Sequence, residues 1–200
     1  MKKNIDILCV GEILIDFIGH QNDVLINETR DYHRYLGGSP ANVAMNCKRL
    51  GLTSLLISTL GIDGFGEYAI NRLNEIGINT NYTKRTSKDS TSVIFVSRSN
   101  GTPDFIPYRS ADYKITEDQI PKDILLKTKI FHTTCFALSK KPAQTTILKK
   151  AKEAFNLDCI LSIDINYAKE LWESKEEALS VIKEYCIYNP LIKISEDDML

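Results

Sequence analysis

Apolar and polar residues follow one another in blocks that predict strands and helices in turn. The run at residues 5–10 is almost wholly apolar and ends at Gly11, which predicts a parallel strand buried on both faces. Further strands are expected at residues 52–60, 129–135, 159–165 and 191–194. Apolar residues at helical spacing predict helices at residues 40–50, 65–76, 142–155 and 174–188. This alternation indicates an α/β fold in which helices cover both faces of a mostly parallel sheet through right-handed crossovers.

Capping residues mark the predicted helix boundaries. Ser39 is a natural N-cap for the first helix, and Pro40 suits the first turn because its missing N–H is not needed there. Gly77 fits the position just past the end of the second helix. Ser174-x-x-Glu177 has the form of a capping box and fixes the start of the last predicted helix.

Two stretches interrupt the alternation of strands and helices. Residues 14–20 and 32–36 read as short paired strands, and residues 91–97 and 105–109 read as a hairpin around an Asn100-Gly101 turn. We interpret the segments at about 14–36 and 90–109 as a small β lid. Because such a sheet has an exposed face, we expect it to support a homodimer.

Composition and charge limit the classes of function. A chain of 200 residues with 43% hydrophobic and 26% charged content fits one soluble domain spanning residues 1–200. Its net charge of −1 gives no global attraction to nucleic acid or to an anionic membrane. The N-terminal apolar run is too short for a signal peptide or a membrane span, so we expect a cytoplasmic protein.

Cysteine and histidine spacing predicts neither disulfides nor a metal site. The five cysteines are odd in number, widely spaced and mostly within apolar runs, and we interpret them as packing residues. The three histidines lack the spacing of metal ligands. No metal site built from protein ligands alone is expected.

A glycine pair leading into a helix is the strongest chemical signal. Gly37 and Gly38 allow positive φ and a close approach of the backbone to a ligand, and Asn42 lies one turn into the helix. A second glycine group, at residues 61–66, opens the next helix, where Asp63 is expected to shape the turn. Read together, the two groups predict a small polyol pocket, although glycines such as these also occur in ordinary turns.

Six segments in this order resemble the PfkB/ribokinase family of carbohydrate kinases, with features of its fructokinase-like members. They are Gly11–Asp16, Gly37–Ala44, Gly61–Gly66, Tyr108–Asp112, Asp164–Trp172 and Lys193–Glu196. The resemblance implies a ribokinase-like three-layer α/β/α fold with a mostly parallel central sheet and a small β lid. It also implies ATP and Mg²⁺ as cofactors and a small sugar as substrate.

The same resemblance implies which residues bind the sugar. Asp16 accepts hydrogen bonds from sugar hydroxyls, and the turn at Gly37 and Gly38 and the Asn42 amide hold other oxygens. A carboxylate and a carboxamide together supply the acceptors and donors that a polyol needs. Taken alone, Asp16 reads as a loop or capping acid and Asn42 as a polar residue at a helix start.

Four more residues acquire roles through the resemblance. Tyr108 and Arg109 lie on the segment that closes over the substrate in relatives, although a surface arginine is the simpler reading of Arg109. Asn166 ends a buried strand at the edge where open α/β sheets bind ligands, so it is expected to position nucleotide phosphates or hydrated Mg²⁺. Lys193 is expected to bind the nucleotide beside it.

Two positions depart from the family pattern. Leu14 stands where ribokinase has an asparagine, which favours a fructose-like ketose or a sugar acid over ribose. Ala168 stands where many fructokinase-like members have an arginine. Lys169 can supply the charge but not the bidentate fork of that arginine.

The family's Gly-Ala-Gly-Asp segment, which carries the general-base aspartate, does not occur in this sequence. Residues 195–198 have the form of a helix start close to the last residue, so we expect an N-terminal portion of a kinase whose 200 residues are inactive alone. The catalytic base is expected outside them. Alternatives are a non-catalytic sugar-binding or regulatory remnant, a nucleoside kinase, or a doubly wound domain of unrelated function.

Overall fold

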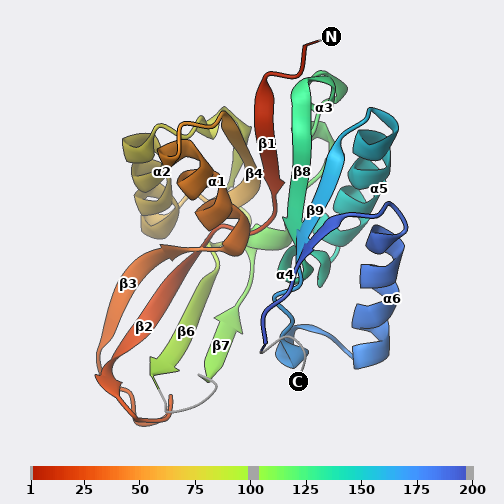
Figure 1. Ribbon diagram of the computed structural model, residues 1–200. Coiled ribbons are helices and arrows are strands. Elements are labelled where there is room, and N and C mark those ends of the chain that lie inside the picture. The colour runs from red at the N-terminus through yellow and green to blue at the C-terminus, as the bar shows by residue number, and fades with distance from the viewer. Residues whose placement is uncertain (1, 99–103, 197–200) are drawn as a thin grey trace.

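A parallel six-stranded sheet forms the centre of the computed structural model, which describes residues 2–98 and 104–196 (Figure 1). The strand order is β10-β9-β8-β1-β4-β5, and each neighbouring pair is parallel. The strands are β1 (Ile5–Val10), β4 (Ser54–Gly61), β5 (Thr83–Thr86), β8 (Thr128–Thr134), β9 (Ile160–Asp164) and β10 (Leu191–Lys193). This confirms the five predicted strands and their parallel pairing, whereas β5 was not predicted.

Helices cover both faces of this sheet (Figure 1). On one face lie α1 (Ser39–Arg49) and α2 (Gly64–Ile76), and on the other lie α3 (Lys122–Lys127), α5 (Ala143–Asn156) and α6 (Lys175–Cys186). The short α4 (Cys135–Leu138) follows the carboxyl end of β8. The three-layer α/β/α fold is therefore confirmed, and none of the described helices is long and apolar enough to cross a membrane.

Burial on both faces explains why β1 is apolar along its length. Leu8 and Val10 belong to the core under α5, whereas Ile7 and Cys9 belong to the core under α1. Alternate side chains of a strand point to opposite faces, so a strand between two helical layers needs apolar residues at both sets of positions.

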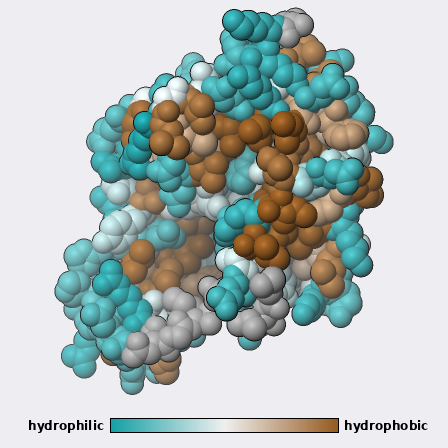
Figure 2. Space-filling view, in the orientation of Figure 1, coloured by the Kyte–Doolittle hydropathy of each residue, from teal (hydrophilic) through white to brown (hydrophobic). Residues whose placement is uncertain are grey.

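Helices α1 and α2 leave β9 and β10, at one edge of the sheet, partly uncovered. Ile7, Ile130 and Ile160 are register neighbours on β1, β8 and β9, yet Ile7 is 8% exposed and Ile160 is 53% exposed. Leu191 on β10 is also exposed. Figure 2 shows the resulting apolar surface over β9 and β10.

The two lid segments pair into a separate four-stranded sheet in the order β3-β2-β6-β7. Its strands are β2 (Leu14–Asn22), β3 (Tyr32–Gly37), β6 (Val93–Arg98) and β7 (Phe105–Tyr108). The sheet extends from the body beyond the carboxyl end of β1 (Figure 1). The predicted turn at Asn100-Gly101 lies outside the described residues, as do residues 197 and 198 of the expected final helix start.

The predicted N-cap of α1 is wrong by one residue. Gly38 occupies the N-cap position and has no side chain to cap with, whereas Ser39 is the first helical residue. The Ser39 hydroxyl instead donates to Asp164 Oδ2 at 2.8 Å. A distant carboxylate competes successfully for this hydroxyl, which local sequence does not reveal.

Candidate functional site

The carboxylate of Asp16 lies directly against Gly37. Asp16 is on β2, and Gly37 is the last residue of the neighbouring strand β3. A Cβ built on Gly37 would lie 2.3 Å from Asp16 Oδ2. No side chain fits between the two, so glycine is required here to admit the carboxylate rather than to adopt an unusual φ.

The surroundings of Asp16 disfavour its ionised form. Burial raises the pKa of its carboxyl from 3.8 to about 6. Among the residues that the structure describes, no hydrogen bond to this carboxylate is found. Asp16 is half-buried, so its carboxylate keeps an open side on which it can accept hydrogen bonds from a ligand.

The next residues of the turn continue this wall. Gly38 has a φ of 101°, and a Cβ there would lie 2.4 Å from the main-chain oxygen of Glu12. The Gly38 carbonyl accepts from the Asn42 N–H at 2.9 Å, and the Asn42 side chain is exposed on the first turn of α1. The structure thus places Asp16 against Gly37, and Asn42 one helical turn beyond Gly38.

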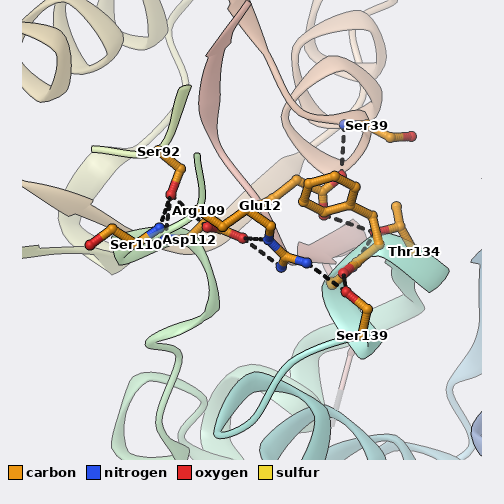
Figure 3. Close-up of polar contacts among 10 residues, drawn as sticks. Glu12, Ser39, Ser92, Arg109, Ser110, Asp112, Thr134 and Ser139 are labelled. Carbon is orange, nitrogen blue, oxygen red and sulfur yellow. Dashed lines mark hydrogen bonds and ion pairs between the residues drawn. The ribbon is translucent and has the colours of Figure 1, made fainter. Parts of the chain in front are cut away.

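Glu12 is a site residue that the sequence interpretation missed. It is 2% exposed and lies between β1 and β2. Its Oε1 accepts from the Ser39 N–H at 3.0 Å, and its Oε2 accepts from the Thr134 hydroxyl at 2.8 Å (Figure 3). Burial raises its pKa from 4.5 to about 7. An acidic residue within the apolar stretch at residues 10–15 was the signal that could have identified it.

Asp164 connects the start of α1 with the residue predicted to bind nucleotide. Its Oδ2 accepts from the Ser39 hydroxyl at 2.8 Å, and its Oδ1 lies 2.9 Å from Lys193 Nζ. Lys193 is the register neighbour of Asp164 on β10, and its side chain is 60% exposed. Asn166, two residues past Asp164, is exposed with a φ of 32°. Asn166 and Lys193 therefore share the carboxyl edge of the sheet.

Arg109 is buried rather than on the surface. Its side chain is 1% exposed and that of Asp112 is 0% exposed. Nε and one terminal nitrogen of Arg109 donate to Asp112 Oδ2 at 2.9 and 2.6 Å, and the other terminal nitrogen donates to Ser139 Oγ at 2.5 Å. The guanidinium also lies 4.1 Å from the centre of the Phe136 ring. Figure 3 shows this cluster beside Glu12.

Tyr108 is not brought to Asp16. In the lid sheet, Tyr108 on β7 pairs with Val93 on β6, and Val93 pairs with Ile15 on β2. Asp16, the next residue of β2, pairs instead with Ile94. Since neighbouring positions of a strand face opposite sides, Tyr108 and Asp16 lie on opposite faces of the lid. The Tyr108 ring is 60% exposed and contacts the edge of Phe95.

The glycines at residues 61–66 have a structural explanation. Asp63 is the N-cap of α2, and its Oδ1 accepts from the N–H groups of Phe65 and Gly66. Its Oδ2 accepts from the Thr91 N–H at 2.7 Å. A Cβ on Gly66 would lie 2.2 Å from the carbonyl oxygen of Gly61. Asp63 thus shapes the turn, as predicted, and ties it to the base of the lid.

Metal-ligating residues do not gather anywhere in the described part of the chain, where no group of three His, Cys, Asp or Glu side chains could hold an ion. His132 is bonded to Ser162 through Nδ1 at 3.0 Å, and burial lowers its pKa to about 4. The rings of His20 and His33 stack on the lid. All five cysteines are free.

Comparison with known proteins concerns the family and the fold. A family model described as pfkB family carbohydrate kinase matches residues 4–199. The chain is 35% identical over 198 residues to an ATP-dependent 6-phosphofructokinase of Thermoanaerobacterium thermosaccharolyticum, covering 98% of this chain and 60% of that protein. It is 34% identical over 196 residues to a probable fructokinase of Arabidopsis thaliana, with coverages of 96% and 60%.

Solved structures show the same likeness. A fructokinase of Halothermothrix orenii superposes with a TM-score of 0.90 at 37% identity, over 97% of this chain and 69% of that one. A sugar kinase of Pyrococcus horikoshii in complex with ATP superposes with a TM-score of 0.84 at 32% identity, over 90% of this chain and 59% of that one. The chain spans 60% of the length of the two sequence relatives named above.

Proposed function

The chain belongs to the pfkB family of carbohydrate kinases, and we propose that it is the sugar-binding part of an ATP-dependent kinase. The proposed reaction transfers the γ-phosphoryl group to a hydroxyl of a small sugar such as fructose, a related keto sugar or a sugar acid. The observation that carries the proposal is the Asp16 carboxylate, which is half-buried, lies against Gly37 and has no hydrogen-bond partner among the described residues.

The proposed sugar site uses complementary hydrogen-bonding groups. The ionised Asp16 carboxylate accepts from sugar hydroxyls, and the Asn42 amide both donates and accepts. The backbone at Gly37 and Gly38 can approach the sugar closely because no Cβ intervenes. A sugar lacking one of the matched hydroxyls would cover a polar group of the site without pairing it, which would give the site its selectivity.

Arg109 is proposed to bind the substrate from the base of the lid. Arginine has five N–H donors, and three of them bond Asp112 and Ser139; because the side chain is 1% exposed, the other two would reach a sugar oxygen or a carboxylate only if the base of the lid shifts. Asp112 holds the guanidinium in one orientation, so little side-chain entropy remains to be lost when a ligand binds. Tyr108 is removed from the proposed site because it lies on the other face of the lid.

ATP is proposed to bind at the carboxyl edge of β9 and β10, near Asn166 and Lys193. An exposed ammonium suits phosphate oxygens, and this edge is where open α/β sheets bind ligands. When bound, Mg²⁺ would offset phosphate charge. Since the described residues form no metal cluster, we propose that phosphate oxygens and water supply most of its ligands.

Catalysis needs more than these residues. The sequence contains no Gly-Ala-Gly-Asp segment to provide a general base. We therefore propose that the 200-residue chain binds sugar but does not turn over ATP by itself. A regulatory sugar-binding role is the second candidate.

The compartment and assembly are also proposals. ATP as phosphoryl donor and five free cysteines fit the reducing cytoplasm. Tyr108 and Ile106, which are 60% and 41% exposed, give the lid face opposite Asp16 an apolar surface suited to a homodimer.

A thermal-shift screen with fructose, ribose, keto-deoxygluconate and nucleosides tests the proposed substrate class. A ligand present at about 100 times its Kd adds roughly 2.7 kcal/mol of stability. Stabilisation by a keto sugar or sugar acid is expected, and stabilisation by nucleosides alone would contradict the proposal. A coupled assay of ATP consumption by the same chain should show no turnover, and normal turnover would overturn the expected inactivity.

A further inference from the structure

A buried carboxylate lies at the junction between the body and the lid, and the proposed sugar contacts do not include it. Glu12 follows β1 and precedes β2, and it is 2% exposed. Its two oxygens bond the Ser39 N–H and the Thr134 hydroxyl. Thr134 in turn accepts from the Ala137 N–H, so Glu12 connects the first residue of α1 with the N-cap of α4 (Figure 3).

The start of α1 depends on this connection. A helix start leaves four N–H groups without helical partners. Gly38, the N-cap, has no side chain to satisfy them, and the Ser39 hydroxyl is bonded to Asp164. Glu12 provides the missing acceptor from 27 positions away, and its ionised form would place negative charge at the positive end of the helix dipole. It thereby fixes the orientation of the peptide between Gly38 and Ser39.

Glu12 also limits the position of the glycine turn through its main chain. Its carbonyl oxygen occupies the place where a Gly38 Cβ would come within 2.4 Å. Glu12 therefore holds the turn at two points: its carbonyl oxygen lies against Gly38, and its carboxylate accepts from the Ser39 N–H. Because Gly37 lies against Asp16 and Gly38 accepts from Asn42, a shift of Glu12 would move both proposed sugar-binding groups.

Stability alone does not account for a carboxylate at this place. Burial is the main cause that raises the Glu12 pKa, and the nearby charges oppose each other, since Arg109 lowers the pKa and Asp112 raises it. With a pKa of about 7, Glu12 is only partly ionised near neutral pH, and its ionised form is disfavoured by burial. Such strain is typical of groups that serve a binding site.

We propose that Glu12 is a positioning residue, which holds the Gly37–Gly38 turn and the start of α1 so that Asp16 and Asn42 face one sugar molecule. This inference rests on the proposed sugar site. It concerns a residue that itself does not touch the sugar and acts through the Ser39 peptide.

The test compares fructose binding by the 200-residue chain, followed by titration calorimetry, in Glu12→Ala and Glu12→Gln variants. We expect Glu12→Ala to weaken binding at least about tenfold, because a misplaced site loses affinity steeply. Glu12→Gln should restore binding, since its Oε1 can accept from Ser39 and its amide can donate to Thr134. The amide proton resonance of Ser39 should move in the alanine variant and return in the glutamine variant.

Thr133→Val is the matched control. It removes another buried hydrogen bond, from Thr133 Oγ1 to the Val10 carbonyl, without contacting the glycine turn. It should lower stability and leave fructose affinity unchanged. If Glu12→Ala does not fold, Glu12→Asp takes its place. Its side chain is one methylene too short to reach both Ser39 and Thr134, so it should also weaken fructose binding.

The outcomes separate the two proposals. Wild-type affinity in Glu12→Ala or Glu12→Asp overturns the positioning role and leaves the sugar site standing. Equal weakening in Glu12→Gln with a native Ser39 resonance also overturns it. If the unmodified chain binds none of the sugars in the screen, the proposed function fails and the positioning role fails with it.

Discussion

The Ser39 hydroxyl donates a 2.8 Å hydrogen bond to Asp164 Oδ2 across 125 positions of the sequence. The bond joins the wall of the proposed sugar site, at the start of α1, to the carboxyl end of β9. Lys193 lies on the other oxygen of the same carboxylate. The proposed sugar side and nucleotide side therefore share one anchoring residue.

Ser39→Ala should destabilise the protein by about 1–3 kcal/mol, because it removes a hydrogen bond to a charged and largely buried acceptor. Asp164 would keep Lys193 as its remaining partner. Urea denaturation measures the loss, with Ser87→Ala at an exposed position as the control. Equal free energies of unfolding for the two variants would show that the bond contributes nothing.

Gly37→Ala should abolish or strongly weaken sugar binding while the chain still folds. The added Cβ would lie 2.3 Å from Asp16 Oδ2, so the carboxylate must leave its place. Gly64→Ala is the matched control, since a Cβ there meets nothing within 4 Å. Titration with fructose distinguishes them, and undiminished binding by Gly37→Ala would contradict the assigned wall.

Asp112→Ala should cost about 3–5 kcal/mol, because it leaves the Arg109 guanidinium buried without its counter-charge. The surface pair of Arg72 and Glu75 provides the contrast, as its side chains are 46% and 58% exposed. Glu75→Ala should cost no more than about 1 kcal/mol. Thermal unfolding of both variants measures the difference, and similar losses would argue against a buried ion pair.

Asp16→Asn should stabilise the protein at neutral pH while removing sugar binding. Between pH 3.8 and about 6 the folded protein binds more protons at Asp16 than the unfolded chain does, so stability falls as pH rises. Asparagine removes this loss, which amounts to at most about 3 kcal/mol. Denaturation over this pH range checks the slope, with exposed Asp123→Asn as the control. A slope that is unchanged in Asp16→Asn would refute the burial argument.

Ile106→Glu should separate a lid-mediated dimer, because it places a charge on the apolar lid face opposite Asp16. Leu191→Lys, at the exposed surface over β10, is the comparison. Light scattering at micromolar concentration should show a dimer for the unmodified chain and for Leu191→Lys, and a monomer for Ile106→Glu. A monomer in the unmodified chain would count against the lid dimer.

Local sequence was enough to predict most of the fold. Five of the six strands of the central sheet, the second helix closed by Gly77 and the paired lid segments follow from side-chain periodicity and turn residues, which act over short distances. Gly77 does adopt the left-handed conformation at the end of α2. The resemblance to carbohydrate kinases pointed to Asp16 and Gly37, which the structure places side by side.

Local sequence patterns do not predict polar contacts between residues that are far apart in the chain. Ser39 was expected to cap its own helix, yet its partners are Asp164 and, through its N–H, Glu12. The face of Tyr108 depended on strand register, and a one-residue difference moves a side chain to the other side of the sheet. The burial of Arg109 depended on Asp112 and Ser139, whose approach is set by the whole fold.

Fructose titration of the unmodified chain and of Asp16→Asn, at neutral pH, tests the central claim most directly. The claim is that the Asp16 carboxylate against Gly37 binds a sugar. We predict saturable binding of one sugar per chain in the unmodified protein and none in the variant. Binding that is equally strong in Asp16→Asn, or no saturable binding of fructose, a sugar acid or another keto sugar by the unmodified chain, would contradict it.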